Sequence, residues 1–195
     1  VKQIACGGYH TCMVLEDDRV ACTGANGNGR LGLGHTTGTT VLEVIGGGFR
    51  AQFVAAGIRH NCALSDGLVL CWGDGSYGRL GQGNTDDQLA PVQVAWLPRG
   101  VEQLSCGGSH CCARHQDRWM CWGWNYCGQL GLGDNDDRGS TSSNTGLEQS
   151  TFCQGCAGTP TDWLLIGVII GASVVFAAAV ALFAWRYKSK IASAV

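Results

Sequence analysis

One pattern recurs three times in this chain, over residues 7–34, 56–83 and 107–133. The histidines that mark each copy, His10, His60 and His110, stand 50 residues apart. A period near 50 with regular glycines and aromatic residues is typical of β-propeller blades or a similar β array. The sequence therefore predicts a mainly β fold, a partial propeller-like array of about three blades. We expect the repeats at about 4–45, 53–96 and 101–134, within a domain of residues 1–134.

Each repeat also contains a readable β-hairpin. In the second repeat, Asp66-Gly67 forms a two-residue turn signal, which places Cys62 opposite Cys71. Counted out from the turn, this pair is not hydrogen-bonded, so its Cα atoms lie about 4.5 Å apart, within disulfide reach. A turn at 116–117 and a three-residue loop at 16–18 place the corresponding cysteines of the other two repeats opposite each other in the same way. The predicted disulfides are therefore Cys12–Cys22, Cys62–Cys71 and Cys112–Cys121.

Six further cysteines have no partner chosen by the sequence: Cys6, Cys106, Cys111, Cys127, Cys153 and Cys156. Fifteen connectivities are open to them. For Cys153-x-x-Cys156 we expect a structural disulfide, or a link to Cys127, and not a redox-active pair, because no helix N-terminus is expected there. All 12 cysteines precede residue 163, and this density suggests an oxidising compartment.

Short β-prone runs at 41–45, 53–55, 91–96 and 101–104 are expected to form the remaining strands. The third repeat has no clear outer strand after it. Residues 135–162 are rich in Ser, Thr, Asp and Gly and read as a linker that carries the CxxC motif.

The repeated pattern G-x-x-H-[TN]-C, followed by C-W-G and G-[RQ]-L-G-x-G, resembles the regulator-of-chromosome-condensation repeat family, in the Cys-containing form of exported proteins. The resemblance covers roughly residues 1–134 and implies blades of four antiparallel strands. It also implies a structural role for His10, His60 and His110. The chain departs from the family in having only three recognisable repeats, where a closed ring usually has about seven. It also has Thr23 at the position that Trp72 and Trp122 occupy in the later copies. Three blades cannot close a ring, so we expect upstream repeats or an open arc whose edges invite a partner.

Residues 163–185 contain no charge and a single hydroxyl, that of Ser173. A helix of this length spans a hydrocarbon core of roughly 30 Å, so the segment is predicted to be a transmembrane helix. Ten basic and 15 acidic residues precede it, and a basic tail (186–195) with three positive charges follows. This asymmetry places the N-terminal domain on the lumenal or exoplasmic side and the tail in the cytosol or stroma.

Small residues recur along one side of this helix: Gly167, Gly171, Ser173, Ala177 and Ala181. Such a strip lets another helix approach closely. The sequence therefore predicts packing against a partner helix within the lipid bilayer.

Catalytic and metal-binding patterns are weak, and we expect no enzyme activity, no metal and no cofactor. Zinc ligands could come from Cys106, His110, Cys111, Cys112, Cys153 and Cys156, but only one CxxC spacing occurs. The acidic turns at 84–87 and 134–137 lack the ligand spacing of a calcium loop. The net negative domain disfavours nucleic acid.

These features favour a non-enzymatic accessory or structural subunit of a larger membrane complex, whose repeat domain clamps its partners. A photosystem, with the domain in the thylakoid lumen, is one concrete version. The alternative is a cell-surface adhesion or ligand-binding single-pass protein. The founding family member is a guanine-nucleotide exchange factor, an activity that a lumenal domain would place on the wrong side of the membrane.

Overall fold

The structure, a computed structural model, describes residues 1–139. These residues form three antiparallel sheets, which we call blades 1, 2 and 3. Blade 1 contains β1 (Gln3–Cys6), β2 (His10–Val14), β3 (Val20–Gly24) and β4 (Thr39–Val44). Blade 2 contains β5 (Phe53–Ala56), β6 (His60–Ser65), β7 (Leu68–Gly73) and β8 (Gln88–Gln93), with the short 3-10 helix η1 (Ser76–Gly78) between β7 and β8. Blade 3 contains β9 (Gln103–Cys106), β10 (His110–His115) and β11 (Arg118–Gly123).

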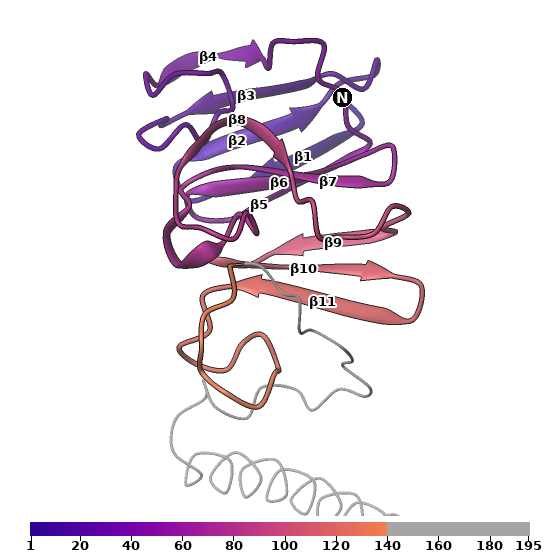
Figure 1. Ribbon diagram of the computed structural model, residues 1–195. Helices are drawn as coiled ribbons and strands as arrows, with labels where there is room; N and C mark the ends of the chain where they lie inside the picture. Colours follow the sequence, from indigo (N-terminus) through magenta and orange to yellow (C-terminus); the bar gives the residue numbers. More distant parts are fainter. Residues whose placement is uncertain (140–195) are drawn as a thin grey trace, which may run out of the picture. The chain divides into compact units, whose positions relative to one another are not determined.

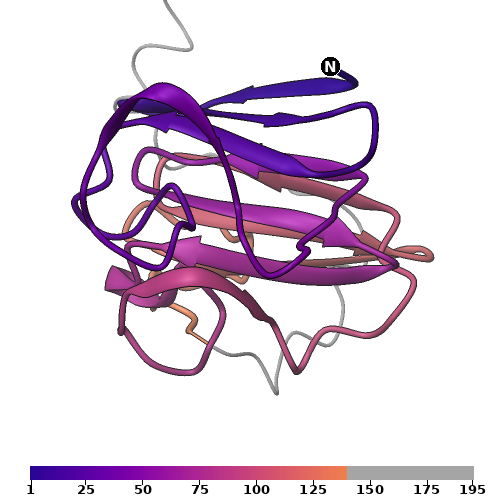
Figure 2. The same cartoon turned by 90° about the horizontal axis from the view of Figure 1, so that it is seen from above.

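The three blades stack face to face in chain order, with the hairpin turns at one end and the long loops at the other (Figures 1 and 2). The first strands of the blades, β1, β5 and β9, lie close to one another, which sets them as the inner strands of the array. Strands β4 and β8 lie at the opposite edge of their sheets. The prediction of a mainly β, propeller-like fold built from antiparallel sheets is confirmed.

The hydrophobic cores lie between neighbouring blades. Alternate residues of a strand face opposite sides, and Cys12, Val14 and Cys22 of blade 1 pack against Val54 and Trp72 of blade 2. A second cluster joins the other face of blade 2 to blade 3 in the same way. Each blade therefore buries its apolar faces only by stacking on a neighbour.

Four disulfides brace the described residues, and their cysteines lie on facing strands. Three of them are the pairs that counting outward from each hairpin turn predicted, Cys12–Cys22, Cys62–Cys71 and Cys112–Cys121. In blade 2, Asp66 and Gly67 have φ values of 50° and 74°, as the tight two-residue turn requires. The fourth disulfide, Cys106–Cys111, joins β9 to β10 and is one that the sequence left open.

Two expected strands are displaced in the structure. The run at 91–96 begins earlier, as β8 at Gln88, and ends at Gln93, because Val94 turns into the core and donates its N–H to Val69. The run at 101–104 becomes β9, which begins at Gln103. Blade 3 has three strands among residues 1–139, and only an isolated bridge between Gly123 and Arg138 takes the place of an outer strand there.

Other predictions fall on residues 140–195 and lie outside the described residues. They are the linker beyond residue 139, the Cys153–Cys156 pair, the helix at 163–185 with its small-residue strip, and the basic tail. Among residues 1–139 there is no helix with the length and apolar character needed to cross a membrane.

Candidate functional site

The long loops that follow β3, β7 and β11, residues 25–38, 74–87 and 124–137, lie at one end of the blades, and we call this end the loop face (Figure 1). Strand β2 begins there too, since His10 pairs with Gly24 at the end of β3. The same register pairs His60 with Gly73 and His110 with Gly123. The repeated histidines and the glycine-rich loops therefore meet at the loop face.

The repeated histidines connect each blade to the next one. The Nε2 atom of His10 lies 2.9 Å from Oδ1 of Asn61 in blade 2, and Asn61 in turn donates Nδ2 to the Arg30 carbonyl. His60 makes the corresponding contact to Sγ of Cys111 in blade 3, at 3.1 Å. Gly57 is required beside His60, because a Cβ there would overlap the imidazole. The structural role that the resemblance implied thus takes the form of a blade-to-blade contact.

Buried tryptophans make a second repeated connection. Trp72 donates its indole N–H to the Arg30 carbonyl of blade 1, and Trp122 donates to the Arg79 carbonyl of blade 2. Both tryptophan side chains are fully buried. In the first copy, Thr23 replaces this tryptophan. The C-W-G and G-[RQ]-L-G motifs therefore bind one another across the blade boundary.

Burial keeps the repeated histidines neutral. It lowers the pKa of His60 to about 3, with a smaller contribution from the positive charge of Arg79. Burial also lowers the pKa of His10, against the hydrogen bond that His10 donates to Oδ1 of Asn61, and it lowers the pKa of His110. A neutral imidazole packed between blades holds the interface together, and a charged one would carry the cost of desolvation.

Acid is expected to destabilise the domain through these histidines. Because the folded-state pKa of His60 is lowered, its contribution is fully present above pH 6.5 and is lost as the pH falls toward 3, while the unfolded chain takes up the proton. Between pH 7.5 and 5.0 this group alone should reduce the free energy of unfolding by about 2 kcal/mol. Urea titrations at both pH values measure the change. His60→Gln should lessen it, whereas His35→Gln, at an exposed loop residue, should not; equal pH dependence in all three proteins would contradict the assignment.

Two disulfides meet at the boundary between blades 2 and 3. Sγ of Cys62 lies 3.5 Å from Sγ of Cys111, and neither sulfur carries a hydrogen, so this is a packing contact. The sulfur atoms of Cys106 and Cys111 also cluster with a ring nitrogen of His60. Because a thiolate is the form of cysteine that binds zinc, the oxidised pairs Cys106–Cys111 and Cys112–Cys121 are not a zinc site. His110 does not belong to this cluster.

The acidic turns considered for calcium use their oxygens within the loops. Asp87 accepts hydrogen bonds from the Gly75 N–H and from Asn28, and Asp137 accepts one from the Asn125 N–H. Asp134 pairs with Arg138 at 2.6 Å. These contacts assign the carboxylates of Asp87, Asp134 and Asp137 to the support of the loop face.

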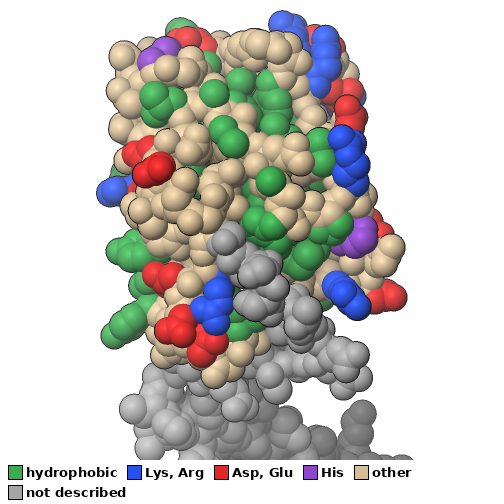
Figure 3. Space-filling model, in the orientation of Figure 1, with side chains coloured by type: hydrophobic (Ala, Val, Ile, Leu, Met, Phe, Trp, Pro, Cys, Tyr) green, Lys and Arg blue, Asp and Glu red, His purple; other side chains and the backbone are tan. Residues whose placement is uncertain are grey.

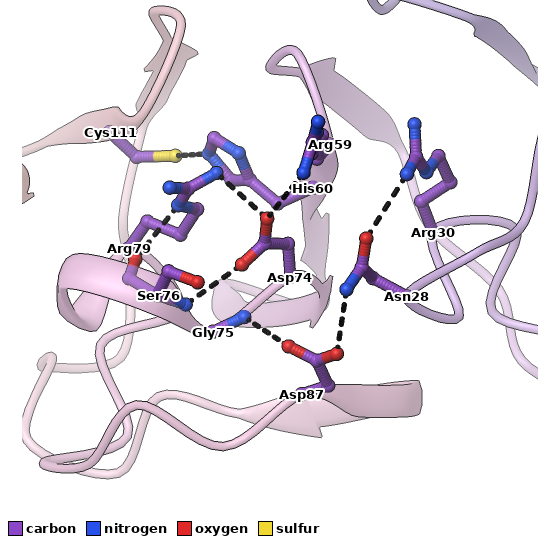
Figure 4. Close-up of polar contacts among 10 residues, drawn as sticks. All are labelled: Asn28, Arg30, Arg59, His60, Asp74, Gly75, Ser76, Arg79, Asp87 and Cys111. Carbon is purple, nitrogen blue, oxygen red and sulfur yellow. Dashed lines mark hydrogen bonds and ion pairs between the residues drawn. The ribbon is translucent and has the colours of Figure 1, made fainter.

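An arginine and aspartate cluster occupies the loop face at blades 1 and 2 (Figure 4). Asp74 and Arg79, both 5% exposed, form an ion pair at 3.3 Å, and Arg59 lies 4.0 Å from the same carboxylate. Burial tends to raise the pKa of Asp74, but hydrogen bonds from Ser76 and the nearby arginine charges leave it below its usual value. Arg30 of blade 1 donates to Asn28, which in turn donates to Asp87.

An aromatic ladder continues the loop face across blades 2 and 3. Tyr77 and Trp124 have ring centroids 5.9 Å apart, and Trp124 stacks on Tyr126 with centroids 6.0 Å apart and planes within 8°. The guanidinium of Arg79 lies over the Tyr77 ring at 5.3 Å. Tyr77 is 50% exposed and Tyr126 is 71% exposed. Three neighbouring rings, of which Trp124 and Tyr126 are stacked and Tyr77 is tilted, therefore form a partly exposed surface on two adjacent loops.

The opposite end of the blades is different in character. Figure 3 shows Lys, Arg, Asp and Glu side chains gathered along the edge where the hairpin turns lie. Several of them form exposed pairs, such as Lys2 with Asp18 and Arg114 with Glu102. Paired, exposed charges contribute little to stability or binding, so the loop face is the stronger candidate site.

Sequence reasoning missed most of this site. The ladder residues Tyr77, Trp124 and Tyr126 follow no shared repeat position, so the repeat pattern gave no signal for them. The partners of Trp72 and Trp122 could have been found from the order of the blades, because each of the two C-W-G motifs contacts the G-R-L-G motif of the preceding copy. The Cys106–Cys111 pair could have been found by treating residues 107–110 as a four-residue hairpin loop.

Comparisons with known proteins agree with the geometry. Residues 66–114, and residues 1–30 with 52–79, match the family described as regulator of chromosome condensation (RCC1) repeat. The chain is 42% identical over 67 residues to the ultraviolet-B receptor UVR8 of Arabidopsis thaliana, covering 33% of this chain and 15% of UVR8.

Solved structures that share the fold include a yeast and a human protein. Prp20p of Saccharomyces cerevisiae, whose binding to Gsp1p and histones has been described, is 22% identical with a TM-score of 0.64, over 72% of this chain and 37% of Prp20p. Human WBSCR16 is 25% identical with a TM-score of 0.64, over 71% of this chain and 36% of WBSCR16. The chain thus spans little more than a third of these proteins. The resemblance to RCC1 repeats is confirmed, and the described fold is an RCC1-like, propeller-type array of three blades.

Proposed function

We propose that residues 1–139 form a protein-interaction domain and that the chain is a non-enzymatic accessory subunit of a larger membrane assembly. The observation that carries the proposal is the aromatic ladder of Tyr77, Trp124 and Tyr126 beside the arginines of the loop face. Trp, Tyr and Arg dominate the residues that supply binding energy at protein interfaces.

The backbone at Tyr77 supports this role. Its φ of 60° lies in the left-handed region, which costs a non-glycine residue of order 1–3 kcal/mol. Glycine would avoid that cost, yet the chain places a half-exposed tyrosine there, next to Trp124. Strain retained at a solvent-exposed position is typical of a surface that binds a partner.

Relatives with this fold also bind proteins. Prp20p binds Gsp1p and histones, and it has been crystallised with Kap60. These likenesses support protein binding in general and name no partner for this chain. The membrane part of the proposal rests on the apolar segment 163–185, and the side of the membrane on which the domain lies stays a prediction.

Substitution of the ladder tests the proposal. The double variant Trp124→Ser with Tyr126→Ser should bind the partner subunits of the assembly at least tenfold more weakly, because two stacked contact residues are lost. Gentle detergent solubilisation, native electrophoresis and mass spectrometry of the bands measure how much of the chain stays in a larger complex. Trp119→Ser is the matched control, since Trp119 is 41% exposed near the hairpin end of β11. A wild-type chain that migrates alone would refute the subunit proposal.

A further inference from the structure

One buried arginine of the loop face, Arg30, forms no ion pair within the described residues. Only 6% of the surface of Arg30 is exposed, and no Asp or Glu of residues 1–139 forms an ion pair with it. Its Nη2 donates to Asn28, while its Nε is buried without a hydrogen-bond partner. A buried charge that lacks a partner is costly, so this guanidinium needs an explanation.

Comparison of the repeats shows which acidic residue blade 1 lacks. The positions of Ala25 and Arg30 in blade 1 correspond to Asp74 and Arg79 in blade 2. In blade 2 the aspartate neutralises the arginine, at 3.3 Å. In blade 1 the same place holds an alanine, which leaves the arginine without a carboxylate at ion-pair distance among the described residues.

Blade 3 shows a third solution. Its corresponding residues are Trp124 and Gln129, so the carboxylate and the positive charge are both absent. Of the three copies, blade 1 alone keeps the buried charge and drops the counterion.

A second arginine of the cluster is exposed to solvent. The side chain of Arg59 is 54% exposed, and it lies beside Asp74 at the loop face (Figure 4). Burial lowers the pKa of Arg30, and the positive charge of Arg59 lowers it further, against the attraction of Asp74 and Asp87. The two guanidinium groups therefore lie within electrostatic range of each other. Figure 4 shows the second terminal nitrogen of Arg30 pointing away from Asn28, with no contact to the residues drawn.

We infer that Arg30 and Arg59 bind a carboxylate from an acidic segment of a partner protein. The inference rests on the proposed function, because it names the chemistry that the loop face recognises. Arginine suits this role, since its planar fork pairs with both oxygens of a carboxylate.

The local charge selects one carboxylate over a phosphate backbone. The cluster holds three arginines (Arg30, Arg59 and Arg79) and two aspartates (Asp74 and Asp87), so its formal charges sum to a single positive charge. A single carboxylate balances that charge. Residues 1–139 contain ten Lys and Arg against thirteen Asp and Glu, and this net negative charge of −3 opposes a polyanion.

Peptide binding to the full chain tests the inference. Fluorescence anisotropy is measured with a labelled Gly-Ser peptide that carries three glutamates, and with the same peptide carrying glutamines. The glutamate peptide should bind at least tenfold more tightly, and Arg30→Gln should remove that preference. Gln129 shows that glutamine fits this repeat position. Arg50→Gln, at an exposed arginine outside the cluster, should leave binding unchanged.

A second variant supplies the missing counterion within the chain. Ala25→Asp copies Asp74, so it should weaken glutamate-peptide binding at least fivefold and raise the melting temperature. Equal binding of both peptides, or unchanged binding in Ala25→Asp, would overturn the inference. So would an oligonucleotide or inorganic sulfate that competes at lower concentration than the glutamate peptide. If the ladder variant loses its assembly while Arg30→Gln keeps full assembly, this inference fails and the proposed function stands.

Discussion

Trp72→Ala is expected to lower the free energy of unfolding by about 3–5 kcal/mol, the usual cost of truncating a buried tryptophan. The side chain is fully buried between blades 1 and 2, its indole N–H donates to the Arg30 carbonyl at 3.1 Å, and its ring meets Phe49 edge-on with centroids 5.8 Å apart. Removal would leave a cavity at the boundary that joins the two blades. Because most small domains have only about 5–15 kcal/mol of stability, one such change takes away a large part of it.

Urea unfolding of the full chain, followed by tryptophan fluorescence and circular dichroism, measures this loss. Trp72→Phe should fall between the wild type and the alanine variant, since it keeps part of the ring volume and loses the N–H donor. Trp119→Ala is the control, because that ring is 41% exposed and its loss should cost less than about 1 kcal/mol. Equal losses for Trp72→Ala and Trp119→Ala would show that the blade boundary is not where stability resides.

Removal of the disulfide between Cys62 and Cys71 is expected to cost about 2–4 kcal/mol. Both sulfurs are fully buried, and the bond closes a loop with a sequence separation of 9. Loop-closure entropy gives roughly 3 kcal/mol for a loop of this size. Packing adds to the effect, because Sγ of Cys62 contacts Cys111 of blade 3.

The double variant Cys62→Ala with Cys71→Ala measures this contribution in the same urea titration. Cys6→Ser is the matched control, since Cys6 is exposed and forms no disulfide with another cysteine of residues 1–139. The control should stay within about 0.5 kcal/mol of the wild type, as surface substitutions usually do. A double variant as stable as the control would contradict a structural role for the blade 2 disulfide.

Much of the fold could be predicted because it is local. Hairpin registers follow from turn residues such as Asp66-Gly67, and once the register is known, the facing of Cys62 and Cys71 follows by counting. The 50-residue spacing of His10, His60 and His110 then indicates how many blades to expect. Errors appear where tertiary packing takes over, as at Val94, which leaves the expected strand to enter the core between blades.

The candidate site was harder to predict, because it depends on departures from the repeat. The histidines of all three copies and the tryptophans of the second and third copies are structural residues of the blades and mark no binding site. The informative residues are those that differ between copies, such as Ala25 in the place of Asp74, or Trp124 in that same place in blade 3. Their meaning requires knowledge of which side chain lies opposite, and a single sequence does not contain that knowledge.

Site-specific photo-cross-linking tests the central claim, that the loop face binds a partner protein. A photoreactive phenylalanine analogue at Tyr126, on the ladder, is compared with the same analogue at Trp119, near the hairpin end of β11. Irradiation of the solubilised native assembly, followed by mass spectrometry, should give a cross-linked partner from position 126 and none from position 119. Cross-links from position 119 alone, with none from position 126, would contradict the claim.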